Sequence, residues 1–104
     1  MDKNLEYLKT HNHDFFIAVL LCERKYRKVL AALFAFCHEI YDIPQSVSDP
    51  MVGKVKFEWW REVLQEVIDG KPPRPHPILQ GLDGSDVDYK LLLKIIDEYD
   101  KLLE

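Results

Sequence analysis

The chain has 104 residues, of which 47% are hydrophobic and 31% are charged, and its formal net charge is −4. A chain of this length can build one hydrophobic core, and this composition excludes an intrinsically disordered protein. The excess of acid argues against a nucleic-acid surface, which needs clustered Lys and Arg to neutralise phosphate. The composition therefore predicts one globular domain over residues 1–104 that binds no nucleic acid.

The sequence offers no sign of export or of membrane insertion. Its longest apolar run, residues 29–37, is too short to span a bilayer and is better explained as a buried helix. The N-terminal residues carry acids and lack the apolar segment of a signal peptide. Cys22 and Cys37 lie in apolar surroundings, which favours reduced core residues. We therefore expect a cytoplasmic protein without a transmembrane segment.

In chain order, a short first helix is expected over residues 5–9. A second helix should begin near Asp14, whose side chain can cap the following turn. Glu23 either begins a third helix or continues the second, and this apolar helix should run to about Asp42. Pro44 is expected to end it, because proline disfavours helical geometry in the residue before it.

Basic side chains cluster once, at the start of this third helix, at Arg24, Lys25, Arg27 and Lys28. A solvated helix turn is one interpretation of the cluster. A contact with an anion or with membrane headgroups is the other.

The next helix has the clearest boundaries, with Asp49 as the N-cap, Pro50 as the first helical residue and Gly70 as the stop. Its apolar residues form two neighbouring stripes. These are Val52, Val55, Trp59, Val63 and Val67 on one side, and Phe57, Trp60, Leu64 and Ile68 on the other. So wide an apolar arc predicts packing against at least two other helices.

Residues 71–77 contain four prolines and should form a stiff, extended connector, with an SH3-type ligand as the alternative. At most a short helix follows over residues 77–82. Ser85 and Asp88 then resemble a capping box ahead of a final helix that runs to the last residue. No segment alternates apolar and polar residues long enough to predict a strand. The expected fold class is all-α, with about four to five helices.

Five features in a fixed order carry a resemblance to a known family. They are Phe15 after Asp14, Arg27 before an apolar helix, Phe34-Ala-Phe-Cys37, Phe57-Glu-Trp-Trp-Arg-Glu62, and Gly70 followed by His76-Pro77. Together they resemble the N-terminal part of the squalene/phytoene synthase family over residues 14–78. The final helix is a weaker continuation. The resemblance implies a helical fragment of the isoprenoid synthase fold, so that residues 1–104 form a single partial domain.

The resemblance also implies where catalytic chemistry would lie. The family carries a run Tyr-Ala-x-Cys-Arg-x-x-Asp-Asp-x-x-Asp, whose carboxylates hold magnesium and, through it, a prenyl diphosphate. Magnesium prefers oxygen ligands and usually takes one or two carboxylates. The three acidic positions here are Tyr41, Asp42 and Gln45. Only Asp42 remains as a weak metal ligand, and Tyr41 and Gln45 are relics of the catalytic set.

Four further positions correspond to the substrate-binding part of the family, namely Asp14, Phe15, Arg27 and His38. Asp14 stands where a serine is usual, and its charge would repel a diphosphate. His38 stands where an arginine is usual, and a mostly neutral imidazole is a weaker phosphate partner. The family's second acidic helix would lie downstream of residue 104. We therefore expect no catalysis by this chain alone and no cofactor, with Mg²⁺ needed only if the chain is active.

Other polar groups have two interpretations each. His38 and Asp42 share a helix face, and with Glu39 they form either a weak divalent-metal site or a solvated edge. The His11-x-His13 pair is expected in a loop. The polar residues Glu58, Arg61 and Glu62 are expected to form surface ion pairs.

Within the family, one branch with degraded acidic motifs is most similar. The similarity lies in Glu39-Ile40, in Ser48-Asp49-Pro50-Met51-x-Gly53 and in Trp59-Trp60-Arg61, and the branch includes mitochondrial complex I assembly factor-like proteins. Two hypotheses follow. In the first, the chain is a non-catalytic, self-associating module that binds a protein partner or a prenyl-type lipid, with Trp59 and Trp60 as interaction residues. In the second, it is the N-terminal part of an active prenyltransferase that condenses two prenyl diphosphates in isoprenoid biosynthesis.

Overall fold

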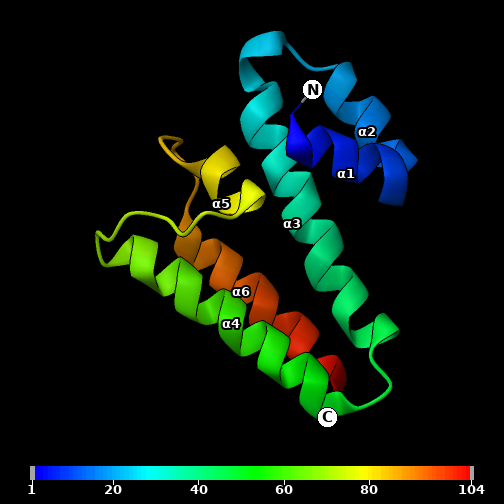
Figure 1. The fold of residues 1–104 in the computed structure, drawn as a ribbon, viewed down its shortest axis with the longest axis vertical. Coiled ribbons are helices and arrows are strands. Elements are labelled where there is room, and N and C mark those ends of the chain that lie inside the picture. Colours follow the sequence, from blue (N-terminus) through cyan, green and yellow to red (C-terminus); the bar gives the residue numbers. More distant parts are fainter. Residues whose placement is uncertain (1, 104) are drawn as a thin grey trace. The chain divides into compact units, whose positions relative to one another are not determined.

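The fold was obtained as a computed structural model that describes residues 2–103 (Figure 1). These residues form six α-helices and two short 3-10 helices and contain no strand, which confirms the all-α class with more helices than expected. The elements are α1 (Lys3–His11), α2 (His13–Leu20), η1 (Arg24–Tyr26), α3 (Arg27–Ser46), α4 (Pro50–Ile68), α5 (Pro77–Leu82), α6 (Tyr89–Asp100) and η2 (Lys101–Leu103). None of the described helices is both long enough and apolar enough to cross a membrane.

The described chain divides into two compact units. Unit 1 holds residues 2–38 and 74–85, and unit 2 holds residues 39–73 and 86–103. The boundary falls within α3, whose first twelve residues belong to unit 1. Helices α1, α2 and α5 complete unit 1, whereas α4 and α6 belong to unit 2.

Unit 1 begins with a longer helix than expected. The Asp2 carboxylate accepts hydrogen bonds from the backbone N–H groups of Asn4 and Leu5, which starts α1 at Lys3 instead of at residue 5. The core of the unit is made of apolar side chains from four helices, ranging in size from alanine to phenylalanine. They are Leu5, Leu8, Phe16, Val19, Ala31, Ala32, Ala35, Phe36, Ile78, Leu79 and Leu82. The alanines of α3 allow close helix packing.

The start of α2 differs from the expectation. Asn12 is the N-cap, and its Oδ1 accepts a hydrogen bond from the Phe15 N–H at 3.1 Å. Asp14 lies in the first turn, where its charge complements the positive end of the helix. Glu23 neither begins α3 nor continues α2, because its extended backbone starts η1, and α3 begins at Arg27.

Helix α3 does not stop before Pro44 but continues to Ser46. Proline at this position lacks the N–H that would bond the Ile40 carbonyl, and its ring crowds that carbonyl. The helix ends two residues later, so the loss is confined to its final turn. The prediction that Pro44 ends the helix was therefore wrong by one turn.

Helix α4 has the predicted boundaries. Asp49 accepts a hydrogen bond from the Met51 N–H at 3.0 Å, Pro50 is the first helical residue, and Gly70 follows the helix with a φ of 89°. Its buried face consists of Gly53, Phe57, Trp60, Val63 and Leu64. Leu92 and Ile96 of α6 and Ile40 and Ile43 of α3 are the other buried apolar residues of unit 2.

Of the two predicted apolar stripes of α4, one is mostly buried, at Phe57, Trp60 and Leu64, whereas the other is buried only at Val63. Val52 and Val55 of the other stripe are 47% and 68% exposed. An apolar face is buried only where another element covers it, and in unit 2 helix α6 lies along the side of α4 that carries Lys54 and Arg61. The position of α6 therefore leaves the two valines in solvent.

The last part of the chain contains two further corrections, at the start and at the end of the final helix α6. Residues 71–76 are not helical, and α5 begins at Pro77, capped by His76, whose Nδ1 accepts from the Ile78 N–H. The expected capping box is absent, because Asp88 alone caps α6 by accepting from the Lys90 N–H, whereas the Ser85 hydroxyl donates to the Leu82 carbonyl. Helix α6 ends at Asp100 and is followed by η2.

Candidate functional site

Two of the predicted substrate-binding residues lie on α2 in unit 1. Asp14 is exposed in the first turn. Phe15 is half-buried, and its ring centroid lies 4.9 Å from that of Phe34 on α3. The carboxylate therefore faces solvent, while the neighbouring ring helps to hold α2 against α3.

Arg27 has a local structural role. Its Nη2 donates a hydrogen bond to the Leu20 carbonyl at 2.9 Å, which satisfies one of the free carbonyls at the end of α2. Its Nε is buried and has no hydrogen-bond partner among residues 2–103. The guanidinium thus ties the start of α3 to the end of α2.

His38 lies in a cluster of rings that the sequence did not predict. The ring centroids of Tyr7 and His11 lie 5.8 and 6.2 Å from that of His38, and Tyr7 stacks on His11 at 4.3 Å. The Asn12 amide nitrogen is 3.4 Å from His38 Nδ1. His11 is the last residue of α1 and His13 is the first residue of α2, so the prediction that this pair lies in a loop was wrong.

The polar contacts of this cluster orient both imidazoles. His11 Nδ1 lies 2.9 Å from the Tyr7 carbonyl oxygen, which can only accept, so Nδ1 is the donor. Asn12 uses its oxygen to cap α2, so its nitrogen is the atom that faces His38. The spacing of four residues between Tyr7 and His11 was the one signal in the sequence, since such residues share a helix face.

The three expected acidic positions lie in unit 2. Tyr41 is 49% exposed and packs edge-to-face on Tyr99 of α6, with 6.2 Å between ring centroids. Asp42 is exposed, and Gln45 donates from its amide nitrogen to the Tyr41 carbonyl at 3.4 Å. Within residues 2–103, no three His, Cys, Asp or Glu side chains form a group that could hold a metal ion.

The adjacent tryptophans of α4 have different environments. Trp60 is 4% exposed and belongs to the core, whereas Trp59 is half-buried. Their rings meet edge-to-face at 5.0 Å. Trp60 is therefore a core residue, and Trp59 lies at the edge of the core.

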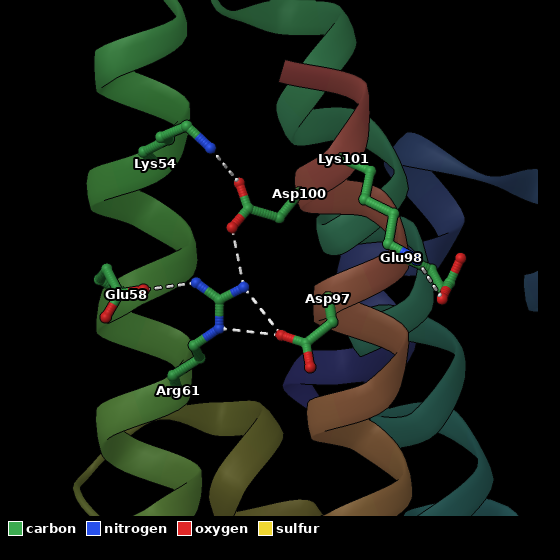
Figure 2. Close-up of polar contacts among 7 residues, drawn as sticks. All are labelled: Lys54, Glu58, Arg61, Asp97, Glu98, Asp100 and Lys101. Atoms are coloured by element: carbon green, nitrogen blue, oxygen red, sulfur yellow. Dashed lines mark hydrogen bonds and ion pairs between the residues drawn. The ribbon is translucent and has the colours of Figure 1, made fainter. Parts of the chain in front are cut away.

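Arg61, on the same helix, is the centre of an ionic network that joins α4 to α6 (Figure 2). Its Nε and Nη2 donate to Asp97 at 3.2 and 2.9 Å, its Nη2 also donates to Asp100 at 2.8 Å, and its Nη1 pairs with Glu58. Lys54 donates to Asp100 from the other side at 3.0 Å. The expected surface pair with Glu58 is present, but the contacts to α6 were not predicted.

The network shifts the proton affinities of its members. Burial alone would lower the pKa of Arg61, but hydrogen bonds to Asp100, Asp97 and Glu58 raise it well above its ordinary range. Burial alone would raise the pKa of Asp100, but hydrogen bonds from Arg61 and Lys54 lower it. Both residues therefore remain charged at neutral pH, and the network is structural in character.

The two cysteines form no disulfide in the described chain, and each is half-buried. Burial raises the pKa of the Cys37 thiol. A thiol with a raised pKa is a poor nucleophile and a poor metal ligand at neutral pH, because the thiolate is the reactive form. Cys37 therefore adds nothing to the candidate chemistry.

Comparison with known proteins assigns the chain to a family. Residues 8–99 match the family described as squalene/phytoene synthase. The chain belongs to this family.

Among curated proteins, this squalene/phytoene synthase family member is similar to "NADH dehydrogenase (ubiquinone) complex I, assembly factor 6". The identity is 25% to the protein of Rattus norvegicus, 26% to that of Bos taurus and 24% to that of Homo sapiens, each over 103 residues. The match covers 96% of this chain but only 31% of each relative. No solved structure shows significant similarity.

Proposed function

We propose that this squalene/phytoene synthase family member is a non-catalytic helical module that binds a protein partner or a prenyl-type lipid. The observation that carries the proposal is the contact between Tyr41 and Tyr99. Tyr41 stands where the family resemblance places a magnesium-binding carboxylate, and here it supplies an aromatic ring that packs on α6. A position that the resemblance assigns to metal binding would then serve helix packing instead.

The surface of α4 supports the interaction role. Val52, Val55 and Trp59 recur at helical spacing, and the two valines are largely exposed. Recognition between helices commonly uses anchors at such spacing. The similarity to proteins named as complex I assembly factors favours a protein as the partner. We further propose that the protein is cytoplasmic and self-associates through this face.

A second candidate function is that of the N-terminal part of an active prenyltransferase of isoprenoid biosynthesis. Family membership and the exposed Asp42 favour it. In that case Asp42 would supply one oxygen ligand to Mg²⁺, which neutralises the leaving diphosphate. Tyr41 and Gln45 carry no carboxylate. Asp42 is therefore the one acidic side chain at the three positions where the family has acids.

Titration calorimetry separates the two functions. The protein is titrated with a non-hydrolysable farnesyl diphosphate analogue, with and without Mg²⁺, alongside Asp42→Asn and the matched exposed variant Asp86→Asn. We expect weak binding that neither Mg²⁺ nor Asp42→Asn changes. Tight, Mg²⁺-dependent binding that Asp42→Asn abolishes and Asp86→Asn preserves would refute the non-catalytic proposal.

A further inference from the structure

The end of α2 exposes an unusual amount of apolar surface. Ile17, Leu20 and Leu21 are 42%, 37% and 82% exposed. They are spaced three and four residues apart at the end of α2, so they share one face. Single exposed apolar residues are common, but a contiguous group on one face indicates an interaction surface.

The basic cluster follows directly after these aliphatic side chains. Arg24, Lys25 and Lys28 are exposed, and Tyr26 between them is 49% exposed with the Lys25 ammonium 5.0 Å from its ring centroid. The hydrogen bond from Arg27 to the Leu20 carbonyl holds this turn against the end of α2. The whole arrangement lies within unit 1 at the N-terminal end of α3 (Figure 1).

The charge of this segment is opposite to that of the rest of the chain. Residues 17–28 hold four basic side chains and one acid, Glu23, whereas the other 92 residues hold ten basic and 17 acidic ones. Glu23 lies 3.8 Å from Lys25 and is largely exposed, so it offsets only part of the positive charge. Asp14 lies one turn further back on α2 than Ile17. An anionic surface would therefore be attracted to residues 17–28 and repelled by the net negative charge of the remaining residues.

We propose that residues 17–28 form a membrane-surface contact that binds anionic lipid headgroups. Leu21 and Leu20 would enter the boundary between headgroups and acyl chains, Tyr26 would lie at the headgroup level, and the basic side chains would pair with lipid phosphates. Aliphatic side chains that project from a turn suit a fluid apolar layer. Nucleic acid is less suitable, because it offers no apolar layer to receive leucines. This inference does not depend on the proposed function.

Vesicle co-sedimentation of the full 104-residue chain tests the proposal. The vesicles are made of phosphatidylcholine alone or with about one third phosphatidylglycerol. We expect binding to the anionic vesicles only, and we expect it to weaken as salt is raised, because salt screens exposed charges. Absence of binding to anionic vesicles, or equal binding to both kinds without salt dependence, would overturn the proposal.

Paired variants locate the contact. The double variant Arg24→Gln/Lys25→Gln should weaken binding about 25-fold, since each basic residue contributes about fivefold. Leu21→Ser should weaken it at least about tenfold. The controls on α6, Lys90→Gln/Lys94→Gln and Leu91→Ser, remove the same groups from exposed positions and should have little effect.

Two further outcomes would refute the proposal. If the α6 controls weaken vesicle binding as much as the variants of Leu21, Arg24 and Lys25, the contact is nonspecific and the proposal fails. If Leu21→Ser lowers the mass measured by light scattering without vesicles, the surface joins copies of this chain, and the proposal also fails. Because all these residues are exposed, circular dichroism should show unchanged helix content in every variant.

Discussion

The Arg61 guanidinium lies 2.8 Å from the Asp100 carboxylate, and this contact joins the middle of α4 to the end of α6. Both side chains are mostly buried, at 25% and 17% exposure. Lys54 holds the other oxygen of Asp100, so one carboxylate bridges two turns of α4. Charge-assisted hydrogen bonds in such surroundings contribute more to the free energy of folding than exposed ion pairs do.

Replacing Asp100 should therefore destabilise unit 2. We expect Asp100→Asn to lower the free energy of unfolding by about 1–3 kcal/mol at neutral pH, because Arg61 and Lys54 lose their shared anion. Urea denaturation followed by circular dichroism measures the change. The control is Glu98→Gln, which breaks only the exposed pair with Lys101 and should cost less than about 0.5 kcal/mol. Equal losses in the two variants would contradict the network's role.

The same carboxylate should make stability depend on pH. Its pKa in the folded protein is lowered below the ordinary value near 4, so the folded state favours the ionised form. The stabilisation is fully present above about pH 4 and is lost as the pH falls through the lowered pKa. The stability difference between wild type and Asp100→Asn should therefore be constant from about pH 7 to about pH 5 and shrink below about pH 4. A difference that persists unchanged in strong acid would show that Asp100 contributes through packing and not through its charge.

Gly81 should tolerate no larger side chain. A Cβ at this position would lie 2.6 Å from the Ala32 Cβ and 2.8 Å from the amide nitrogen of Asn4, which is buried and donates to the Pro77 carbonyl. The Ala32 Cβ cannot move without shifting α3, and the Asn4 amide can move only by losing its hydrogen bond to Pro77. Gly81→Ala should therefore cost about 1–3 kcal/mol of stability. Thermal unfolding of the variant measures this cost.

Gly53→Ala provides the matched comparison. Its Cβ would lie 2.7 Å from Leu103 Cδ1, the end of a flexible side chain in η2. That side chain can rotate away, so the loss should be clearly smaller than at Gly81. Comparable losses at the two glycines would contradict the distinction between rigid and flexible neighbours.

The sequence was sufficient to predict the boundaries of helices that are marked by strong local signals. Asp49, Pro50 and Gly70 mark the ends of α4 by their own side-chain chemistry and backbone preferences, and the structure confirms all three. Asn12 was missed as a cap because Asp14 is an equally good capping residue by type. Side-chain type alone does not decide which of two such neighbouring residues is the N-cap. The packing of α2 selects between them.

The contacts between distant elements were beyond the sequence. The spacing of Glu58 and Arg61 within one helix predicts their pairing, but nothing local indicates that Asp97 and Asp100 lie beside them. His38 likewise meets His11 only because α1 packs near α3 within unit 1. Periodicity identifies which face of a helix is apolar, not which partner covers it, and for that reason the exposure of Val55 was not foreseen.

The adjacent tryptophans of α4 allow stability to be separated from interaction. Trp60 is 4% exposed, so Trp60→Ala should leave a cavity that costs about 3–5 kcal/mol, a large part of the stability of so small a protein. Trp59 is only half-buried, so Trp59→Ala should leave the fold intact. Chemical denaturation with circular dichroism detection distinguishes the two outcomes.

If α4 is the interaction surface, Trp59→Ala should also weaken association by about 2 kcal/mol, because aromatic anchors carry a large share of interface energy. Val55→Ser should act in the same direction, since its side chain is 68% exposed on the same face. Asp42→Asn, an exposed change on α3, should alter neither stability nor association. Light scattering over a range of protein concentrations measures self-association for all three variants. If Asp42→Asn disrupts association while Trp59→Ala and Val55→Ser do not, the interaction surface lies at the former acidic positions and the assignment to α4 is wrong.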